Sequence, residues 1–426
     1  MSEFSRRDFL KTMGLAGVTA SFGMLGVPAI ASANIKGKVV IIGGGFGGAT
    51  CANYIKRYAP GVDVTLIEPN KQFVTCPFSN AVIGGLKTID YVTHSYDDLK
   101  NKQHVKVVQD TVTAIDGGGR KITLKSGKVL SYDRLVVSPG VAFNWSAIEG
   151  YNENIAQKIP HAWKAGDQTL LLRKQLESMS DGGLYLISVP KKPFRAPPAP
   201  YERASLVANY FTENKPKSKI LILDANAITD EVALFKKAWA KTYDGMIEWV
   251  GEAEVKKVDS DAMNVQTSGG QKYKGDVINI VPPQKAGHIA QVSGLADKSG
   301  WCGVNQRTFE SVKMKDVHII GDSCVAGDMP KTGHAANSQA KVCAAAIVSS
   351  MSGTGMPEPV LNASIYSLIT PKYGTSDAGV YRLKDEKLTR VAGGISSDKP
   401  NRKTQLKEAK FASGWYKSIT SEMFAN

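Results

Sequence analysis

A glycine-rich turn between an apolar strand and a helix constrains the fold of this chain more than any other feature. Four apolar residues at 39–42 lead into the turn, and a second apolar run ends at Glu68, where a ribose-binding carboxylate is expected. Gly43 permits a tight turn, Gly45 lets the backbone approach a pyrophosphate, and Gly48 lets the helix pack closely against the sheet. The pattern predicts a strand-helix-strand unit that binds a dinucleotide with its phosphates at the helix N-terminus. The candidate cofactor-binding residues of this unit are Gly43, Gly45, Phe46, Gly48 and Glu68.

The first 33 residues have the pattern of an export signal. Arg6 and Arg7 precede a modestly apolar stretch at 13–27, and small residues follow at 31–33 as a cleavage site would require. The apolar stretch contains several glycines and is too short to span a bilayer. We therefore expect export by the twin-arginine route to a bacterial periplasm, and we exclude residues 1–33 from the fold.

The composition of the remaining chain is that of a globular protein. Of the 426 residues, 42% are hydrophobic and 22% are charged, and a chain of this length suits two or three domains. The formal net charge of +14 favours an acidic protein partner or a small anionic substrate. Nucleic acid is excluded as a partner, because the basic residues form no block interleaved with aromatics. After the signal, no apolar run is long enough to predict an integral membrane segment in the mature chain.

The cysteines predict neither a disulfide framework nor a metal site. Their number is odd and their spacing is irregular. The sequence has no CxxC pair, no CxxCH haem attachment motif and no His/Cys cluster at metal-ligand spacing. Cys51 and Cys343 lie among alanines in predicted helices, so we expect them in the core.

Two later strands complete the predicted cofactor domain. A strand at 132–137 runs into a Pro-Gly turn, and a short strand at 317–320 ends at Gly321-Asp322. Both patterns resemble those of flavoproteins with two dinucleotide-binding domains, in which the second strand brings an aspartate to the ribityl chain of FAD. Gly321 and Asp322 therefore favour FAD over NAD as the bound dinucleotide.

A second α/β unit is predicted in the middle of the chain, without a nucleotide. The strand at 184–189 runs into a proline-rich segment at 190–200. Proline offers no N–H group to a phosphate and disfavours the helix start that a phosphate cradle needs. Further strands at 219–224 and 277–281 keep the α/β character of this unit. We therefore expect the domain to be present but unable to bind NAD(P)H.

The predicted fold is α/β, with two Rossmann-like dinucleotide-binding domains of the glutathione-reductase type and a C-terminal interface region packed near the flavin. The expected boundaries are residues 1–33 for the signal, 34–150 and 276–350 for the two parts of the FAD domain, 151–275 for the middle domain, and 351–426 for the C-terminal region.

Short strings from residue 36 to the C-terminus resemble the flavoprotein subunit of flavocytochrome c sulfide dehydrogenase. They include Thr75-Cys76, Phe194-Arg195, Gly300-Trp301-Cys302, Gly321-Asp322-Ser323-Cys324 and Met329-Pro330-Lys331-Thr332-Gly333. The resemblance implies a periplasmic FAD oxidoreductase that oxidises a reduced sulfur compound and passes electrons to a c-type cytochrome subunit. It also implies a covalent thioether between Cys76 and the 8α carbon of FAD.

The sequence departs from that family at its redox-active disulfide, which sulfide attacks beside the flavin. One cysteine of the pair is expected where Ala196 stands and the other within residues 361–366, yet no cysteine follows Cys343. Because half a disulfide has no function, the paired loss indicates a changed mechanism. Either the substrate attacks the flavin directly or it differs from sulfide.

The remaining catalytic candidates are Cys302, Cys324 and Lys331. Each has an ordinary alternative, because buried cysteines are normally packing residues and lysines are normally solvated. Arg195 is a further cation that could face the flavin, and His334 matches no role.

Two other functions stay open at this point. A flavin-loaded partner or assembly subunit without substrate chemistry is favoured by the lost cysteines, but Cys76 and Asp322 argue against it. A quinone-linked sulfide oxidoreductase would need a membrane-binding amphipathic segment at the C-terminus, and residues 411–419 are only weakly amphipathic.

Overall fold

The computed structural model describes residues 35–425, and the export signal predicted over residues 1–33 lies outside the described residues. The first layer of the fold is a sheet of five strands, each parallel to its neighbours. Strands of parallel sheets are buried on both faces, which explains their continuous apolar runs. The strands lie in the order β20 (Val317–Ile319), β9 (Arg134–Val137), β1 (Lys38–Ile42), β2 (Asp63–Ile67) and β5 (Lys106–Val108).

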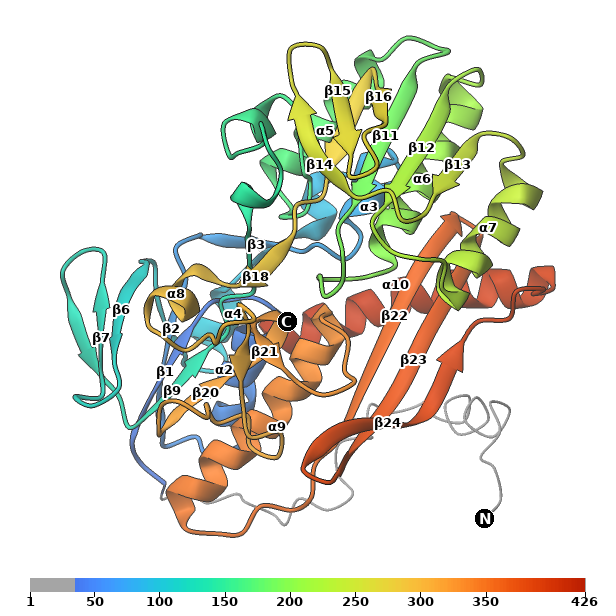
Figure 1. Cartoon of the computed structure of the whole chain (residues 1–426). Coiled ribbons are helices and arrows are strands. Elements are labelled where there is room, and N and C mark those ends of the chain that lie inside the picture. Colours follow the sequence, from blue (N-terminus) through green and yellow to red (C-terminus); the bar gives the residue numbers. More distant parts are fainter. Residues whose placement is uncertain (1–34, 426) are drawn as a thin grey trace.

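Two long helices pack against each other beside this sheet, α2 (Phe46–Tyr58) and α9 (Gly333–Ser352) (Figure 1). Cys51 on α2 and Cys343 on α9 are both buried, and their thiols are hydrogen-bonded to each other. Burial raises the pKa of the Cys343 thiol, so it stays protonated at neutral pH. The prediction that both cysteines belong to the core is confirmed.

The middle of the chain forms a second sheet, of four parallel strands. Its order is β13 (Ile247–Val250), β12 (Lys219–Asp224), β11 (Leu184–Val189) and β17 (Val277–Ile280). The predicted end of the middle domain at residue 275 is wrong by one strand, because β17 pairs with β11. The sequence analysis had already assigned the strand at 277–281 to this unit, and only the boundary at residue 275 left it out. The helices of this domain are α5 (Asp167–Ser178), α6 (Ala199–Asn214) and α7 (Asp230–Thr242).

Short strands and helices lie at the surface of the two domains and connect them. The antiparallel pair β10 (Val141–Phe143) and β18 (Gln284–Ala286) joins the two segments that pass between the domains. The other strands are β3 (Gln72–Val74), β4 (Thr93–Ser95), β6 (Val112–Asp116), β7 (Lys121–Leu124), β8 (Val129–Ser131), β14 (Val255–Asp259), β15 (Asn264–Thr267), β16 (Lys272–Lys274), β19 (Cys302–Gly303) and β21 (Cys324–Val325). The short helices are α3 (Ser79–Ile83), α4 (Asp97–Asn101), α8 (His288–Val292) and the 3-10 turn η4 (Gly321–Ser323).

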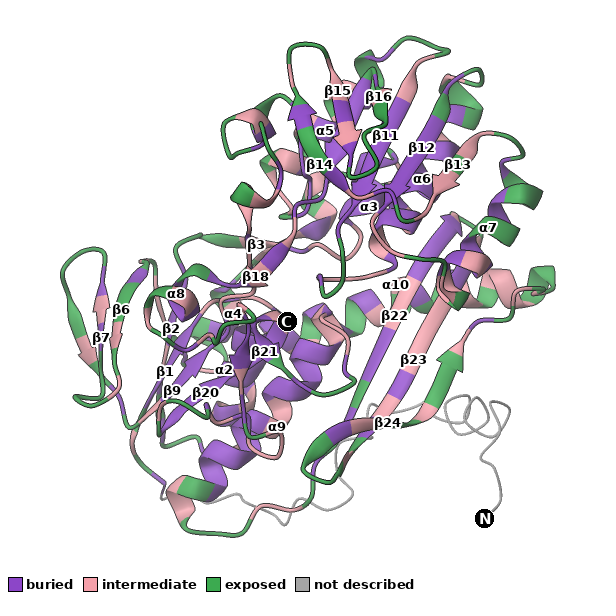
Figure 2. Ribbon diagram, viewed as in Figure 1, coloured by how far each residue is buried: buried purple, intermediate pink, exposed green. Residues whose placement is uncertain are grey.

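The C-terminal region forms a third layer that contacts both domains. Its antiparallel strands are β22 (Val360–Thr370), β23 (Tyr373–Lys384) and β24 (Lys387–Ile395), and the helix α10 (Arg402–Phe424) follows them. β22 is largely buried whereas β24 is largely exposed (Figure 2). On the middle domain, the Leu368 N–H donates to Glu202 on α6 at 3.0 Å.

The helix α10 ends against the first domain. Glu422 accepts a hydrogen bond from Asn337 on α9 at 3.1 Å and pairs with Lys341 at 2.8 Å. Two residues later, the ring of Phe424 packs against the ring of Tyr96, with centroids 5.7 Å apart. The apolar face of α10 is therefore used for packing within the protein. Over residues 35–425 the structure contains no helix with the length and apolar character needed to cross a bilayer.

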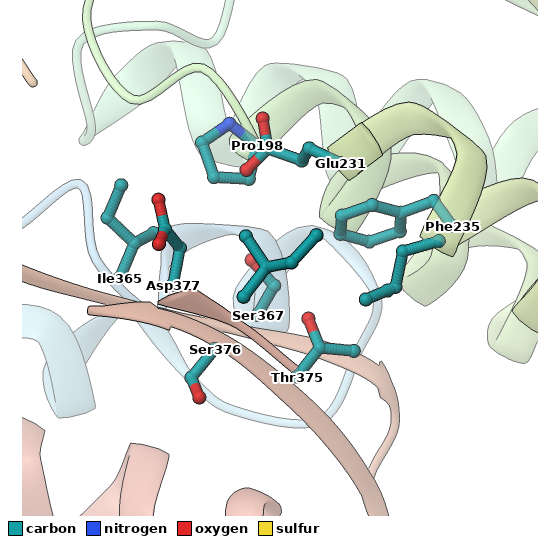
Figure 3. Close-up of a pocket in the computed structure, with 10 residues that line it drawn as sticks. Pro198, Glu231, Phe235, Ile365, Ser367, Thr375, Ser376 and Asp377 are labelled. Atoms are coloured by element: carbon teal, nitrogen blue, oxygen red, sulfur yellow. The ribbon is translucent and has the colours of Figure 1, made fainter. Parts of the chain in front are cut away.

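A small pocket lies where α7 approaches β22 and β23 (Figure 3). Glu231, at the start of α7, faces it, and Asp377 on β23 lines the opposite side while pairing with Arg390 at 2.6 Å. Burial raises the pKa of Glu231 to about 7. The charge of Asp377 also raises this pKa, whereas that of Lys192 lowers it. The other lining residues include Pro198, Phe235, Ile365, Ser367 and Thr375.

The raised pKa of Glu231 predicts a pH-dependent stability. Because the folded state holds this proton more tightly than the unfolded state, stability is lost as pH rises from about 4.5 to 7. The Glu231→Gln variant cannot ionise, so we expect it to be more stable than the parent by about 1–3 kcal/mol at pH 8 and nearly equal at pH 4.5. Thermal unfolding of both proteins across this range measures the difference. Glu248→Gln, at an exposed residue of β13, is the control, and an equal gain at both pH values would contradict the prediction.

Candidate functional site

The glycine turn after β1 has no room for side chains at two positions. Gly43 has φ +94°, and a Cβ there would lie 2.3 Å from the Ser138 carbonyl oxygen. A Cβ on Gly48 would lie 1.9 Å from the Gly43 carbonyl oxygen. The turn delivers the chain into α2, whose N-cap Gly45 makes no side-chain capping bond. The first-turn amides of α2 therefore have no side-chain acceptor, as a phosphate site requires.

Glu68 lies beside this turn at the end of β2. Its carboxylate accepts hydrogen bonds from the Gly44 N–H at 2.9 Å and from the Asn70 side chain at 2.8 Å. The Tyr96 hydroxyl donates to the Gly44 carbonyl at 3.1 Å from the other side. A carboxylate has about four acceptor sites, so Glu68 retains capacity for the hydroxyls of a ribose. Phe46, the first residue of α2, is buried against the ring of Phe73.

Asp322 lies in η4, directly after β20, with a buried oxygen that has no partner. Within residues 35–425 no hydrogen-bond donor reaches its Oδ1. Burial raises the pKa of Asp322, while Arg195 and Lys331 act in the opposite direction. The neighbouring Gly321 has φ +77° and donates its N–H to Gln339 at 2.7 Å. Buried carboxylate oxygens are normally satisfied, so Oδ1 of Asp322 is suited to a hydroxyl donor such as a ribityl chain.

Two residues that contact Arg195 each have a buried polar atom without a partner in the described chain. These atoms are the indole Nε1 of Trp163 and the amide Nε2 of Gln284. Arg195 donates its backbone N–H to Gln284 Oε1 at 2.9 Å and its guanidinium to the Trp163 carbonyl. Arg195 also acts electrostatically on Asp322. The sequence analysis assigned no role to Trp163 or Gln284. The signal that could have found them is their place in two further short strings, 160–166 and 282–284, that also resemble the flavocytochrome c flavoprotein subunit.

Cys76 extends this cluster at the Trp163 carbonyl, the same atom that Arg195 contacts. Its Sγ lies 3.6 Å from the Trp163 carbonyl oxygen. All five cysteines lie in the described chain, and Cys76 alone is not buried. The candidate flavin site therefore consists of Cys76, Trp163, Arg195, Gln284 and Asp322, drawn from five separate segments. Its accessible thiol and three unpartnered polar atoms fit a flavin nucleotide.

The weaker catalytic candidates lie at the edge of this site. Cys302 and Cys324 are register partners in the parallel pair β19 and β21, and both are buried. Burial raises the pKa of Cys302 to about 11 and that of Cys324 to about 12, so neither is a thiolate at neutral pH. Lys331 donates to the carbonyls of Asp322 and Cys324 at 2.8 Å each. These contacts give Lys331 a role in holding the Asp322 turn.

The segment that carries Ala196 approaches the strand β22, which contains residues 361–366. Ala196 adopts φ +52° and donates its N–H to the carbonyl of Lys331 at 2.8 Å, and the side chain of Lys331 in turn contacts Asp322 of the candidate flavin site. Pro198 follows two residues later and lines the same pocket as Ile365 on β22 (Figure 3). No thiol stands at Ala196 or within residues 361–366. The ring of His334 accepts a hydrogen bond from the Ser364 N–H at 3.0 Å and so helps to fix the position of β22.

The middle domain has no cradle for a second nucleotide. Its helix α6 begins after the N-cap Pro198 with proline in the first turn. Asp224 ends β12 where a ribose-binding carboxylate would stand, but it accepts hydrogen bonds from the Tyr201 hydroxyl at 2.6 Å and the Trp249 indole at 3.0 Å. Protein side chains therefore occupy this position, in agreement with the proline-rich sequence.

Family models and solved structures agree with this architecture. Residues 37–174 match the pyridine nucleotide-disulphide oxidoreductase family. The solved structure of sulfide:quinone oxidoreductase from Aquifex aeolicus has a TM-score of 0.74 at 18% identity and covers 91% of this chain and 92% of that one. A covalent putidaredoxin reductase–putidaredoxin complex gives a TM-score of 0.66 at 14% identity and covers 92% of this chain and 99% of that one. These likenesses show the two-domain flavoprotein fold.

Sequence relatives show to which family of such flavoproteins the chain is similar. The mitochondrial sulfide:quinone oxidoreductase of Dictyostelium discoideum is 26% identical over 317 residues, which are 72% of this chain and 69% of that protein. The sulfide dehydrogenase (flavocytochrome c) flavoprotein chain of Chlorobaculum thiosulfatiphilum is 60% identical over 45 residues, which are 11% of this chain and 94% of that sequence. Residues 169–282 match the central region of such flavoprotein chains, and residues 357–424 match the flavin-binding region of flavocytochrome c sulphide dehydrogenase. The chain therefore belongs to the family of flavocytochrome c sulfide dehydrogenase flavoprotein chains and is an FAD-dependent oxidoreductase.

Proposed function

We propose that this protein oxidises a reduced sulfur compound, most simply sulfide, in the periplasm and passes the electrons to a separate c-type cytochrome. The observation that carries the proposal is the cluster of unpartnered polar atoms around Arg195, next to the accessible thiol of Cys76. The twin-arginine pattern supports the location, and the similarity to a flavocytochrome c flavoprotein chain supports the acceptor. Bound FAD would supply a two-electron acceptor that can release electrons one at a time.

Each residue of the candidate flavin site has a distinct task in this proposal. Asp322 accepts a hydrogen bond from the ribityl chain through its free Oδ1. Arg195 places positive charge where negative charge develops when electrons arrive. Cys76 tethers the cofactor through a thioether. Since Ala196 replaces a family cysteine, no thiol at that position can accept a sulfur atom from the substrate.

A quinone acceptor is the second candidate, favoured by the sulfide:quinone oxidoreductases among the relatives. In this chain the buried residues of the C-terminal helix α10 include Tyr416, Ile419 and Met423, which pack within the protein. The face that would lie in a membrane interface is therefore already used, and we rank the cytochrome acceptor first.

Reduction of the bound flavin tests the donor and the acceptor. We expect sulfide to bleach the visible flavin absorbance and then to reduce added cytochrome c. NADH and NADPH should leave the flavin oxidised. In the middle domain, the carboxylate of Asp224 that would bind a ribose already accepts hydrogen bonds from Tyr201 and Trp249. Anaerobic titration followed by stopped-flow mixing with the cytochrome measures both steps. A flavin that sulfide cannot reduce would instead support a subunit without substrate chemistry, and preferential reduction of a quinone would support the second candidate.

Asp322 provides a test of the flavin site itself. Loss of a hydrogen bond to a charged group costs about 1.5–3 kcal/mol, so we expect Asp322→Ala to weaken FAD binding by about 10- to 100-fold. The same variant removes a buried carboxylate oxygen without a partner, so the protein without FAD should be no less stable than the parent. Equilibrium dialysis, with Cys76→Ser in both proteins so that FAD stays noncovalent, and thermal unfolding measure the two effects. Asp261→Ala, whose side chain is 96% exposed, is the control. Unchanged FAD affinity in Asp322→Ala would place the flavin elsewhere.

A further inference from the structure

The outer face of the C-terminal helix α10 carries a line of lysines, which we call the basic stripe. Its members are all exposed and follow one another at intervals of four, three and seven residues: Lys403, Lys407, Lys410 and Lys417. Residues at these intervals lie on one face of an α-helix. Figure 2 shows the exposed residues along α10. The four charges therefore face solvent together.

No acidic side chain pairs with the basic stripe. Among residues 35–425, none of its four lysines forms an ion pair. The two acidic residues of α10 have other partners, because Glu408 accepts a hydrogen bond from Ser396 at 2.6 Å and Glu422 pairs with Lys341 at 2.8 Å. The stripe is thus a positive surface on a chain whose formal net charge is +14.

The basic stripe does not stabilise the helix that carries it. The first turn of α10 contains Arg402 and Lys403 and no acidic residue, although a helix dipole favours negative side chains at this end. Lys407 lies four residues after Lys403 and three before Lys410, and like charges at these spacings repel each other. Lysines that weaken their own helix point to a role outside it.

One exposed aromatic ring accompanies the stripe. Phe411 is 43% exposed, and the Lys407 ammonium group lies 5.3 Å from the centroid of its ring. Phe411 is the only exposed large hydrophobic side chain of α10. An aromatic side chain among cations suits a protein surface with carboxylates around an apolar contact. A bilayer would require a broad apolar face, which α10 turns towards the protein interior.

The inner face of α10 contacts the segment that carries Cys76. The hydroxyl groups of Tyr416 and Thr75 are hydrogen-bonded at 2.7 Å, and the ring centroids of Tyr416 and Phe78 are 4.8 Å apart. Cys76 lies between Thr75 and Phe78 in the sequence. An α-helix with its side chains is about 10 Å across. A protein bound to the basic stripe would therefore lie about one helix diameter from the candidate flavin site.

We propose that the basic stripe and Phe411 form the docking surface for the electron acceptor, and that this acceptor is an acidic protein. The inference rests on the cytochrome acceptor of the proposed function and assigns the charge of that acceptor and its place on the chain. Oxidation of one reduced flavin to FAD reduces two ferric haem groups to the ferrous state, and the protons of the flavin pass to water. Attraction between the stripe and an acidic patch accelerates this step because it speeds the encounter of the two proteins.

The test measures electron transfer without a sulfur substrate. The flavin is reduced with a stoichiometric amount of dithionite and mixed in a stopped-flow instrument with one of two small c-type cytochromes of similar potential, one acidic and one basic. We expect the parent to reduce the acidic cytochrome faster, with a rate constant that falls as salt rises. At about 0.1 M salt, a variant that combines four substitutions should reduce the acidic cytochrome about tenfold more slowly than the parent. The substitutions are Lys403→Gln, Lys407→Gln, Lys410→Gln and Lys417→Gln.

A matched control removes the same charge from other surfaces. It combines substitutions at four exposed lysines in the turn between β7 and β8 and on β16: Lys125→Gln, Lys128→Gln, Lys272→Gln and Lys274→Gln. This control should stay within about twofold of the parent, because charges more than about 10 Å apart are largely screened at about 0.1 M salt. The variant of the basic stripe loses like-charge repulsion, so thermal unfolding should find it at least as stable as the parent.

The outcomes separate this inference from the proposed function. If the parent reduces neither cytochrome, the cytochrome acceptor is refuted and the docking surface with it. If the parent reduces the acidic cytochrome and the stripe variant does so at the same rate and with the same salt dependence, the docking surface is refuted while the acceptor stands. Faster reduction of the basic cytochrome by the parent would also overturn the inference.

Cross-linking of the parent gives a second test that needs no variant. A water-soluble carbodiimide should join carboxylates of the acidic cytochrome to lysines of the basic stripe, as mapped by mass spectrometry of the digested product. Products at other lysines alone would refute the docking surface. Sedimentation with phosphatidylglycerol vesicles that depends on the stripe, together with unchanged reduction of the cytochrome by the stripe variant, would assign the surface to a membrane instead.

Discussion

The candidate flavin site depends on one buried guanidinium, that of Arg203. It donates to the side chains of Asn80 and Asn279 and to the backbone carbonyls of His161 and Ala162. These partners come from α3 of the first domain, from β17 of the middle domain and from the segment that carries Trp163. A buried cation of this kind is tolerated only with its donors satisfied, so the three segments are held in one arrangement. The position of Cys76 relative to Arg195 follows from that arrangement.

Local sequence patterns predicted those parts of the fold that depend only on interactions between neighbouring residues. The glycine turn after β1 and the Gly321-Asp322 turn after β20 follow from backbone sterics over a few residues, and the structure has both. The candidate flavin site as a whole was less predictable. Trp163 and Gln284 matter because Arg195 bonds to both, and such contacts between distant segments leave no periodic signal.

Where the resemblance implies a disulfide, the chain has a defined local structure. Ala196 holds a left-handed backbone conformation and is hydrogen-bonded to Lys331, while Ile365 contributes an apolar side chain to the neighbouring pocket. The remaining thiols do not replace the pair, because Cys302 and Cys324 are buried and protonated at neutral pH. Chemistry at this site must therefore rely on the cofactor and on the cations around it.

The end of α10 ties the C-terminal region to the nucleotide turn of the first domain. Phe424 packs on Tyr96, whose hydroxyl donates to the Gly44 carbonyl in the turn after β1. One aromatic ring therefore lies between the last turn of α10 and the backbone where the phosphates of a dinucleotide would bind. A shift of α10 would reach that backbone directly, so the C-terminal region can influence how tightly the nucleotide is held.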